Sequence, residues 1–253
     1  MDDRPRYDLI GDVHGCLDEA LRLLAKLGYG VTRDEDSRYR ITPPLGRRAV
    51  FLGDLVNRGP QIPGLLRLVM DMADDGGALC VRGNHDFYLL RRLQGANVLR
   101  EFGPTYGRAA ETSVSQLDAE DDAFVARVTA FLEGLPPYLI LDDGRLVAAH
   151  AGLPARHQRK DSAEARDFAV FGPKEGDAVS WPQDYKGKAL VVYGHYARPD
   201  VRWSKNAVCL DTGCLYGGRL TALRYPELEM VSVEAARVYY ESAKFNQRAK
   251  AKA

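Results

Sequence analysis

The chain has 253 residues, 45% of them hydrophobic, which is enough to build one large domain or two small ones. Its 35 Lys and Arg residues balance its 35 Asp and Glu residues, which excludes an overall field that would draw it to nucleic acid or to a membrane. No apolar run reaches about 18 residues and none near residue 1 is typical of a signal peptide, so we expect a cytoplasmic protein with no membrane partner and no obligate protein partner.

Short apolar runs that end at glycine-containing turns recur along the chain and predict strands. Such unbroken runs are typical of strands that are covered on both faces, as in a layered α/β domain. In chain order, the runs are residues 7–10, 48–52, 78–81, 145–149, 189–193 and 207–210.

Helical patterns separate the first three strands. The leucines of residues 17–27 recur at helical spacing and predict a helix that ends at Gly28. Apolar residues predict a second helix around residues 65–70 and a third around residues 89–93. Residues 105–135 are acidic and helical in pattern, with no strand signal, and predict a helical insertion.

The end of the chain changes in composition. Residues 234–253 begin with a helical pattern and become basic and low in complexity. We expect a single domain over residues 1–240 and a frayed basic tail over residues 241–253. Weak contact of this tail with nucleic acid is a minor alternative.

Polar side chains recur directly after the predicted strands. In chain order they are Asp12, His14, Asp54, Asn84, His85, His150 and His195. The ends of strands on one edge of an α/β sheet are where ligands bind, so these loops are expected to converge. One such residue alone is more often a turn former, but recurrence at so many strand ends points to a site. Oxygen and imidazole ligands without cysteine suit Mn²⁺, Fe or Zn²⁺ better than a structural zinc cage.

Five motifs in a fixed order carry a family resemblance. They are "GDVHG" (11–15), "GDLVNRGP" (53–60), "GNHD" (83–86), "HAGL" (150–153) and "GH" (194–195). As a set they resemble the signature of the calcineurin-like metallophosphoesterases, in the phosphoprotein-phosphatase branch. Residues 193–233 are similar to a narrower group, which includes the phosphatase domain of bacterial polynucleotide kinase-phosphatases and the bacterial diadenosine tetraphosphatases. The resemblance covers nearly the whole predicted domain.

The resemblance implies an α/β fold of four layers, αββα, in which two mixed β-sheets are flanked by helices. It also implies two divalent metal ions at one edge, with Mn²⁺ as the expected metal and Fe, Zn²⁺, Ni²⁺ or Co²⁺ as alternatives. The implied ligands are Asp12 and His14 for the first ion, Asp54 for both ions, and Asn84, His150 and His195 for the second. Two ions held in this way clamp a phosphate and stabilise both the entering and the leaving oxygen.

Catalytic roles follow from the same resemblance. Asp54 and His85 would be catalytic, with His85 as the acid that protonates the leaving group. Arg58, Asn84, His85 and Asp211 would bind the substrate, and Arg58 would grip the phosphate as a planar cation with several donors. For Asp211 the alternative is a strand-end aspartate that caps the turn at residues 212–214.

Two positions depart from the family pattern. The family more often has aspartate where this chain has Asn57, which leaves the acid–base partner of His85 open. The protein phosphatases usually have glutamate where this chain has Asp86, and the aspartate fits the nucleotide-acting relatives. His157 lies outside every motif and is expected at the surface.

We therefore predict a metal-dependent phosphoesterase with a binuclear centre. Its substrates would be phosphate esters or anhydrides of nucleotides or nucleic-acid ends, so its partner would be a phosphorylated small molecule, a nucleotide or a nucleic-acid end. A serine/threonine protein phosphatase is the alternative. A non-catalytic phosphate-binding module is the weakest hypothesis, because every expected ligand residue is present.

Overall fold

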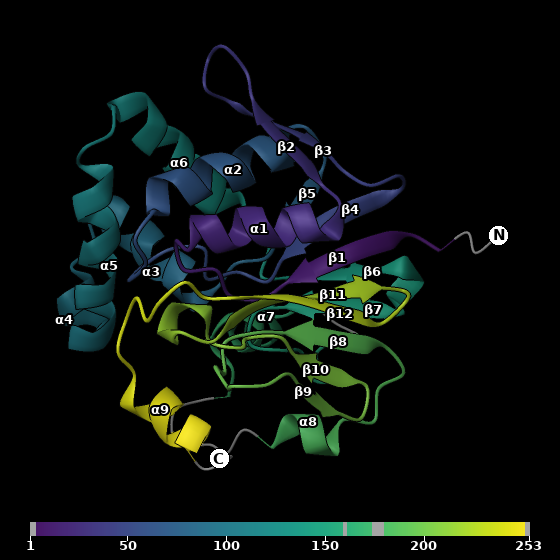
Figure 1. Ribbon diagram of the computed structural model, residues 1–253. Coiled ribbons are helices and arrows are strands. Elements are labelled where there is room, and N and C mark those ends of the chain that lie inside the picture. Colours follow the sequence, from purple (N-terminus) through teal and green to yellow (C-terminus); the bar gives the residue numbers. More distant parts are fainter. Residues whose placement is uncertain (1–3, 159–160, 174–179, 251–253) are drawn as a thin grey trace.

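Two mixed five-stranded sheets form the centre of the protein (Figure 1). The computed structural model describes residues 4–158, 161–173 and 180–250. The first sheet contains β1 (Arg6–Ile10), β4 (Arg47–Phe51), β5 (Ala78–Cys80), β11 (Arg219–Tyr225) and β12 (Glu229–Glu234), in the order β12-β11-β1-β4-β5. The second contains β6 (Tyr138–Leu141), β7 (Leu146–Ala149), β8 (Leu190–Tyr193), β9 (Arg202–Ser204) and β10 (Ala207–Cys209), in the order β6-β7-β8-β10-β9. The strands β1, β4 and β5 are parallel to one another, and so are β7, β8 and β10.

Alternate strand residues fill the space between the two sheets. Leu9 of β1 lies in this space, while its neighbour Ile10 packs on the opposite face of the sheet, because successive side chains of a strand point to opposite faces. Val50 of β4 meets Val192 of β8 and Val208 of β10 in the same layer, and all are fully buried. Burial of both faces explains why these strands appear in the sequence as unbroken apolar runs.

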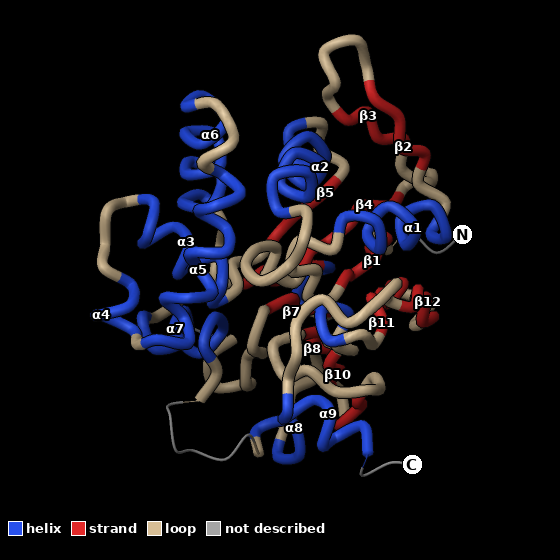
Figure 2. The backbone as a smooth tube through the Cα atoms, turned by 60° about the vertical axis from the view of Figure 1, so that its left-hand side comes forward, coloured by secondary structure: helices blue, strands red, loops and turns tan. Residues whose placement is uncertain are grey.

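Helices cover the outer faces of both sheets, so the expected αββα sandwich is confirmed (Figures 1 and 2). The outer face of the first sheet packs with α1 (Leu17–Leu27), α2 (Ile62–Asp74), α3 (Asn84–Leu93), α5 (Pro104–Leu117) and α6 (Asp122–Gly134). The outer face of the second packs with α7 (Ala163–Phe171) and α8 (Trp181–Asp184). The helices α5 and α6 form the predicted helical insertion, on the left in Figure 1, and α4 (Val98–Phe102) precedes it.

Local signals in the sequence account for most of these elements. The helix α1 ends at Gly28 as predicted, where φ is 92° and the N–H bonds to the carbonyl of Ala25 at 3.0 Å. The hairpin of β2 (Gly30–Arg33) and β3 (Tyr39–Thr42) was not predicted, because its short strands mix charged with apolar residues. The helices formed by the described residues include none that is long and apolar enough to cross a membrane.

Two expectations about exposed residues are wrong. A helix, α9 (Ala243–Lys250), occupies most of the segment where we expected a frayed tail, while residues 251–253 lie outside the described part of the chain. Phe245 of this helix is 6% exposed, and its ring centre lies 5.4 Å from that of Tyr216, so one aromatic side chain anchors an otherwise charged segment. His157, expected at the surface, is 5% exposed, with its ring centre 5.5 Å from that of Phe168.

Candidate active site

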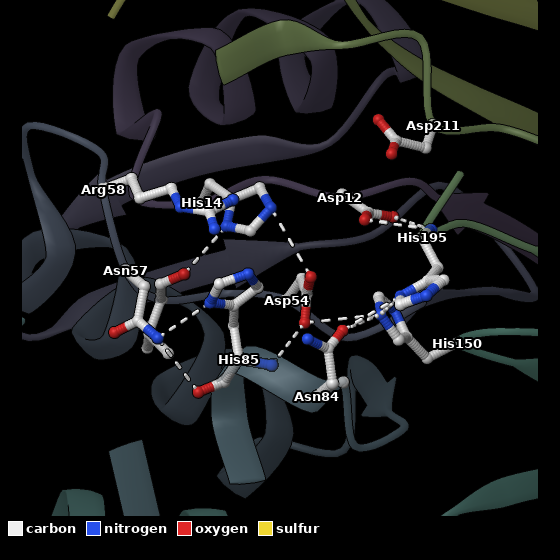
Figure 3. A network of polar contacts seen from close by, with 12 residues as sticks. Asp12, His14, Asp54, Asn57, Arg58, Asn84, His85, His150, His195 and Asp211 are labelled. Carbon is white, nitrogen blue, oxygen red and sulfur yellow. Dashed lines mark hydrogen bonds and ion pairs between the residues drawn. The ribbon is translucent and has the colours of Figure 1, made fainter. Parts of the chain in front are cut away.

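The loops that follow β1, β4, β5, β7, β8 and β10 converge at one edge of the sandwich (Figure 3). They bring together the residues that the motifs singled out: Asp12, His14, Asp54, Arg58, Asn84, His85, His150, His195 and Asp211. A cavity of about 440 Å³ is lined by these side chains except for His150, which is fully buried and contacts Asn84 and His195. Segments far apart in the sequence thus build one polar pocket.

Several of these residues have a backbone conformation that residues other than glycine rarely adopt. The angle φ is 47° at His14, 50° at Asp54 and 68° at His195. It is also positive at Asn57 and Arg58, at 72° and 69°. Each such residue costs on the order of 1–3 kcal/mol, so the surrounding structure has to hold it in place. Because of these turns, the side chains point into the pocket. In a regular strand or helix they would point elsewhere.

Asp86 stabilises the turn that carries Asp54. Its carboxylate accepts hydrogen bonds from the backbone N–H groups of Asp54 and Gly83, each at 2.8 Å, and of Leu55 at 2.9 Å. Glycine is required at position 83, because a Cβ there would lie 2.2 Å from the backbone nitrogen of Asp54. Burial, together with the charge of Asp54, raises the pKa of Asp86 to about 7.

Two histidines point their Nε2 atoms at the two oxygens of the Asp54 carboxylate. His14 Nε2 lies 3.5 Å from Oδ2, and His150 Nε2 lies 3.4 Å from Oδ1. The Nδ1 atom of each ring lies 2.9 Å from a backbone carbonyl, that of Val56 for His14 and that of Leu52 for His150. Because a carbonyl only accepts, Nδ1 carries the proton in both rings, and each Nε2 presents a lone pair toward Asp54.

Two ring nitrogens and an amide oxygen meet beside the Asp54 carboxylate. His150 Nε2 lies 2.9 Å from Asn84 Oδ1 and 3.0 Å from His195 Nδ1, and the last two atoms are 3.0 Å apart. Neither this Nε2 nor an amide oxygen carries a proton, so the two atoms repel each other unless a cation lies between them. Neighbouring ligands around an octahedral ion with bonds of about 2.1 Å are about 3.0 Å apart. The spacing and the chemistry of these atoms therefore fit a divalent cation.

The buried carboxylates also require positive charge. Ligand atoms of Asp12, Asp54 and His150 lie within 4.8 Å of one another, and so do those of His14, Asp54 and His85. Burial raises the pKa of Asp54 to about 7 in the protein alone, and burial likewise raises the pKa of Asp12 well above its usual range. Burial lowers the pKa of His14 to about 3 and that of His150 to about 4, so both rings are neutral near pH 7. Neutral imidazoles beside buried carboxylates are a suitable donor set for metal ions.

His85 borders this cluster and is held by Asn57. The amide nitrogen of Asn57 lies 3.0 Å from His85 Nδ1 and donates to the backbone carbonyl of His85 at 3.2 Å. The amide oxygen accepts from Ser113 Oγ at 2.5 Å, which fixes which way the amide is turned. His85 Nδ1 is therefore an acceptor, and the proton of the neutral ring is on Nε2, the nitrogen that faces away from Asn57 (Figure 3).

Arg58 offers hydrogen-bond donors next to the cluster. Its backbone N–H donates to Thr112 Oγ1 at 2.7 Å, and its guanidinium donates to the hydroxyl of Tyr216 at 3.2 Å. The guanidinium carbon lies 5.1 Å from the centre of the Tyr240 ring. Its Nε is buried and has no hydrogen-bond partner among the described residues. A planar cation with free donors in such a position is suited to bind phosphate.

Asp211 caps a turn, the alternative that its sequence context left open, and it also lies in the pocket. Its Oδ1 accepts from the N–H of Gly213 at 3.1 Å, as expected for the cap of a turn. It also lines the cavity, where burial raises its pKa to about 7. The turn that it caps thus lies within the pocket.

Some residues around the site were not found from the sequence. Thr112 and Ser113 belong to α5, and nothing in the sequence ties this helix to the motif at residues 53–60. Lys244 and Arg248 of α9 line the cavity, although their segment has the composition of a disordered tail. In both cases the contact depends on how the chain folds back, which local patterns do not encode.

Comparisons with known proteins agree with this geometry. The model of the calcineurin-like phosphoesterase family matches residues 5–231. The bis(5'-nucleosyl)-tetraphosphatase PrpE of Anoxybacillus flavithermus is 39% identical over 245 residues, covering 92% of this chain and 96% of its own length. The PrpE protein of Bacillus subtilis is 36% identical over 250 residues, which cover 93% of this chain and 97% of that protein.

Solved structures give the same result. The crystal structure of a protein assigned as a diadenosine tetraphosphatase matches with a TM-score of 0.64 and 25% identity, over 92% of this chain and 95% of that one. A protein serine/threonine phosphatase from Saccharomyces cerevisiae shares the fold at a TM-score of 0.54 and 14% identity. The match covers 95% of this chain and 82% of that one. The chain thus belongs to the calcineurin-like phosphoesterase family and is a metal-dependent hydrolase of phosphate ester or anhydride bonds.

Proposed function

We propose that this enzyme hydrolyses a phosphoanhydride bond in a dinucleoside tetraphosphate. The observation that carries the proposal is the pair of donor clusters that share Asp54 beneath a cavity flanked by Arg58. Such a pocket can hold a phosphate chain, and relatives that align over nine-tenths of this chain are bis(5'-nucleosyl)-tetraphosphatases. The alternative within the family is a serine/threonine protein phosphatase.

The ligand atoms gathered around Asp54 support a binuclear centre, with the ligands divided between the two ions as the family resemblance implies. Asp12 and His14 would hold one ion, the set Asn84, His150 and His195 would hold the other, and Asp54 would contribute one oxygen to each. Mn²⁺ is the expected metal, with Fe, Zn²⁺, Ni²⁺ and Co²⁺ as alternatives, because the ligands are oxygen and imidazole atoms without cysteine. When bound, the two ions would neutralise phosphate charge and make a water molecule more acidic.

The chain's own residues would orient the substrate. The free donors of Arg58 would bind oxygens of the phosphate to be cleaved, in a charge-assisted hydrogen bond. His85 would donate its Nε2 proton in a hydrogen bond to the leaving oxygen, and Asn84 would lie beside it as both ligand and substrate contact. Asp211 would contact the substrate from the end of the cluster that lies away from Arg58 (Figure 3).

The hydrogen bond from Asn57 favours an anhydride as the substrate. A neutral His85 with its proton on Nε2 is a good hydrogen-bond donor but a weak acid. The phosphate end of a nucleotide leaves as a stable anion and needs little protonation, whereas an alkyl alcohol such as a serine side chain needs a proton as the bond breaks. The pocket is thus better matched to a nucleotide leaving group than to a phosphoserine.

A turnover panel tests the proposal. The protein is stripped of metal with a chelator, reloaded with Mn²⁺, and assayed on diadenosine tetraphosphate, a 2′,3′-cyclic nucleotide, a 3′-phosphorylated oligonucleotide and a phosphopeptide. We expect the highest kcat/KM on the tetraphosphate and none without metal. A higher kcat/KM on the phosphopeptide would assign the enzyme to the protein phosphatases instead. No turnover of any substrate by the reloaded protein would leave only a binding role.

A further inference from the structure

The C-terminal segment forms one wall of the cavity, although its composition is that of a tail. The residues of this segment that line the cavity are Tyr240, Glu241, Ser242, Lys244, Phe245 and Arg248. In Figure 1 the yellow chain leaves β12 and runs down the left side to α9. The segment thus runs from the first sheet along one side of the cavity.

Contacts at both ends hold this wall in place. The N–H groups of Tyr239 and Tyr240 both donate to the carbonyl of Leu215 at 3.0 Å. Phe245 packs so tightly on the turn below it that a Cβ on Gly213 would lie 2.2 Å from its ring. At the far end of α9, Arg248 donates to the carbonyl of Ala197 at 2.6 Å. The helix is therefore a fixed part of the pocket.

The wall adds two cations on the side of the cluster away from Arg58. Lys244 lines the cavity together with His195, and its charge acts on this ring. Arg248 lines the cavity together with Asp211, and it donates a hydrogen bond to the carbonyl of Ala197, two residues after His195. In Figure 3 Asp211 and His195 lie at one end of the cluster and Arg58 lies at the other.

Neither of these two cations forms a direct ion pair with a carboxylate among the described residues. The charges of Arg198 and Arg202 act on Arg248, and so does that of Asp211, which lines the cavity with it. Glu241 is the acidic residue of the segment that lines the cavity, and Asp211 is the buried one beneath. A row of cations facing a metal-ligand cluster is complementary to an extended anion rather than to a single phosphate.

We propose that Lys244 and Arg248 bind the part of a polyphosphate chain that lies beyond the phosphate being cleaved. The inference rests on the proposed function and deepens it, because it assigns to α9 the preference for a polyphosphate over a simple monoester. The cluster and Arg58 serve the reacting phosphate, which every substrate of the enzyme has. The two cations of α9 contact only the phosphates that a monoester lacks.

Charge-removing variants test this role. Lys244→Gln and Arg248→Gln remove the charges, and glutamine at position 248 keeps a donor for the carbonyl of Ala197. We expect kcat/KM for diadenosine tetraphosphate to fall about fivefold for each variant and at least about tenfold for the double variant, mainly through KM. For an aryl phosphate we expect a much smaller fall in kcat/KM. The ratio of kcat/KM for the tetraphosphate to kcat/KM for the aryl phosphate should therefore drop. Lys250→Gln is the matched control, because Lys250 is exposed on the same helix and does not line the cavity. This variant should have the same ratio of kcat/KM values as the native enzyme.

A binding measurement separates this inference from the proposed function. Inorganic tripolyphosphate and orthophosphate are titrated calorimetrically into the metal-loaded protein, which requires no turnover. The double variant should lose affinity for tripolyphosphate at least about tenfold more than for orthophosphate. If both ligands or both substrates are weakened to the same degree, α9 has only a structural role and the inference fails. If the native protein cleaves the aryl phosphate but not the tetraphosphate, the proposed function fails, and the tripolyphosphate titration still decides the role of α9.

Discussion

Asn57 donates its side-chain amide to Nδ1 of His85 across 3.0 Å, and this bond places the proton of the ring on Nε2. The amide cannot turn round without cost, because its oxygen accepts from Ser113 and its nitrogen also donates to the carbonyl of His85. Burial lowers the pKa of His85 well below its usual range, which keeps the ring neutral. An aspartate at position 57 would instead accept from a protonated Nδ1.

Asn57→Asp should therefore change the preference of the enzyme for leaving groups. A carboxylate beside Nδ1 stabilises the charged ring and so raises the pKa of His85. The ring can then give a proton to a poor leaving group, so we expect a larger gain in kcat for an alkyl phosphate than for an aryl phosphate. The alkaline limb of the pH–rate profile should also move to higher pH. If neither the profile nor the ratio of the substrates moves, Asn57 is only a turn residue.

A second prediction concerns Asp86. Asp86→Asn replaces one acceptor oxygen by an amide group, which then faces either the N–H groups of Asp54 and Gly83 or that of Leu55. We expect the free energy of unfolding to fall by about 1–3 kcal/mol, because a buried donor is left without an acceptor. Turnover should fall as well, because the turn that carries Asp54 loses a hydrogen bond that holds it in place. Denaturant unfolding measures the first effect, and Asp118→Asn at an exposed position is the control. Equal stability of both variants would contradict the role assigned to Asp86.

The motifs could be predicted from the sequence because they are local. The strand before Asp12 and the glycines on either side of it are visible in a run of a few residues, and the parallel strands then bring such ends together. The contacts that hold these residues in place could not be predicted. The bond between Asn57 and Ser113 joins positions 56 apart, and the positive φ at His14 depends on tertiary contacts. The burial of Phe245 depends on a turn in another part of the chain.

Arg58→Ala should weaken phosphate binding while leaving the metal content intact. The guanidinium has a buried Nε without a partner among the described residues and is unsuited to bind a cation itself. A charge-assisted hydrogen bond is worth about 1.5–3 kcal/mol, so kcat/KM should fall about ten- to a hundredfold. Steady-state kinetics and elemental analysis of the same preparation check both statements. Arg58→Lys should recover only part of the loss, because an ammonium group lacks the planar fork. Unchanged kcat/KM in the alanine variant would assign Arg58 to the turn alone.

Metal affinity should depend on pH through the buried carboxylates. Burial raises the pKa of Asp54 from its ordinary 3.8 to about 7, so below that pH a metal ion has to displace a proton from it. The pKa values of His14 and His150, lowered to about 3 and about 4, leave these rings neutral throughout the range. The Kd for Mn²⁺ should thus fall by about tenfold per pH unit for each proton displaced up to about pH 7, and level off above it. Calorimetry in two buffers of different ionisation enthalpy measures the released protons. A Kd that is constant from about pH 5.5 to 8 would contradict this account.

Loss of Asp54 should damage the site more than loss of any other ligand. Its two oxygens face His14 and His150, so its removal affects both donor clusters at once, whereas Asp12 belongs to one of them. Elemental analysis of the native protein is expected to find two ions per chain, and anomalous scattering should place both in one cluster. Asp54→Asn keeps the size of the side chain and an acceptor for the N–H of His85, but its neutral amide can hold at most one ion well. We therefore expect fewer than two ions in Asp54→Asn and a loss of activity of at least about a thousandfold, the scale of losses seen when one central catalytic group is removed. Asp211→Asn, which changes a carboxylate of the same pocket outside the proposed ligand set, should keep two ions; loss of an ion there as well would assign Asp211 to the metal centre.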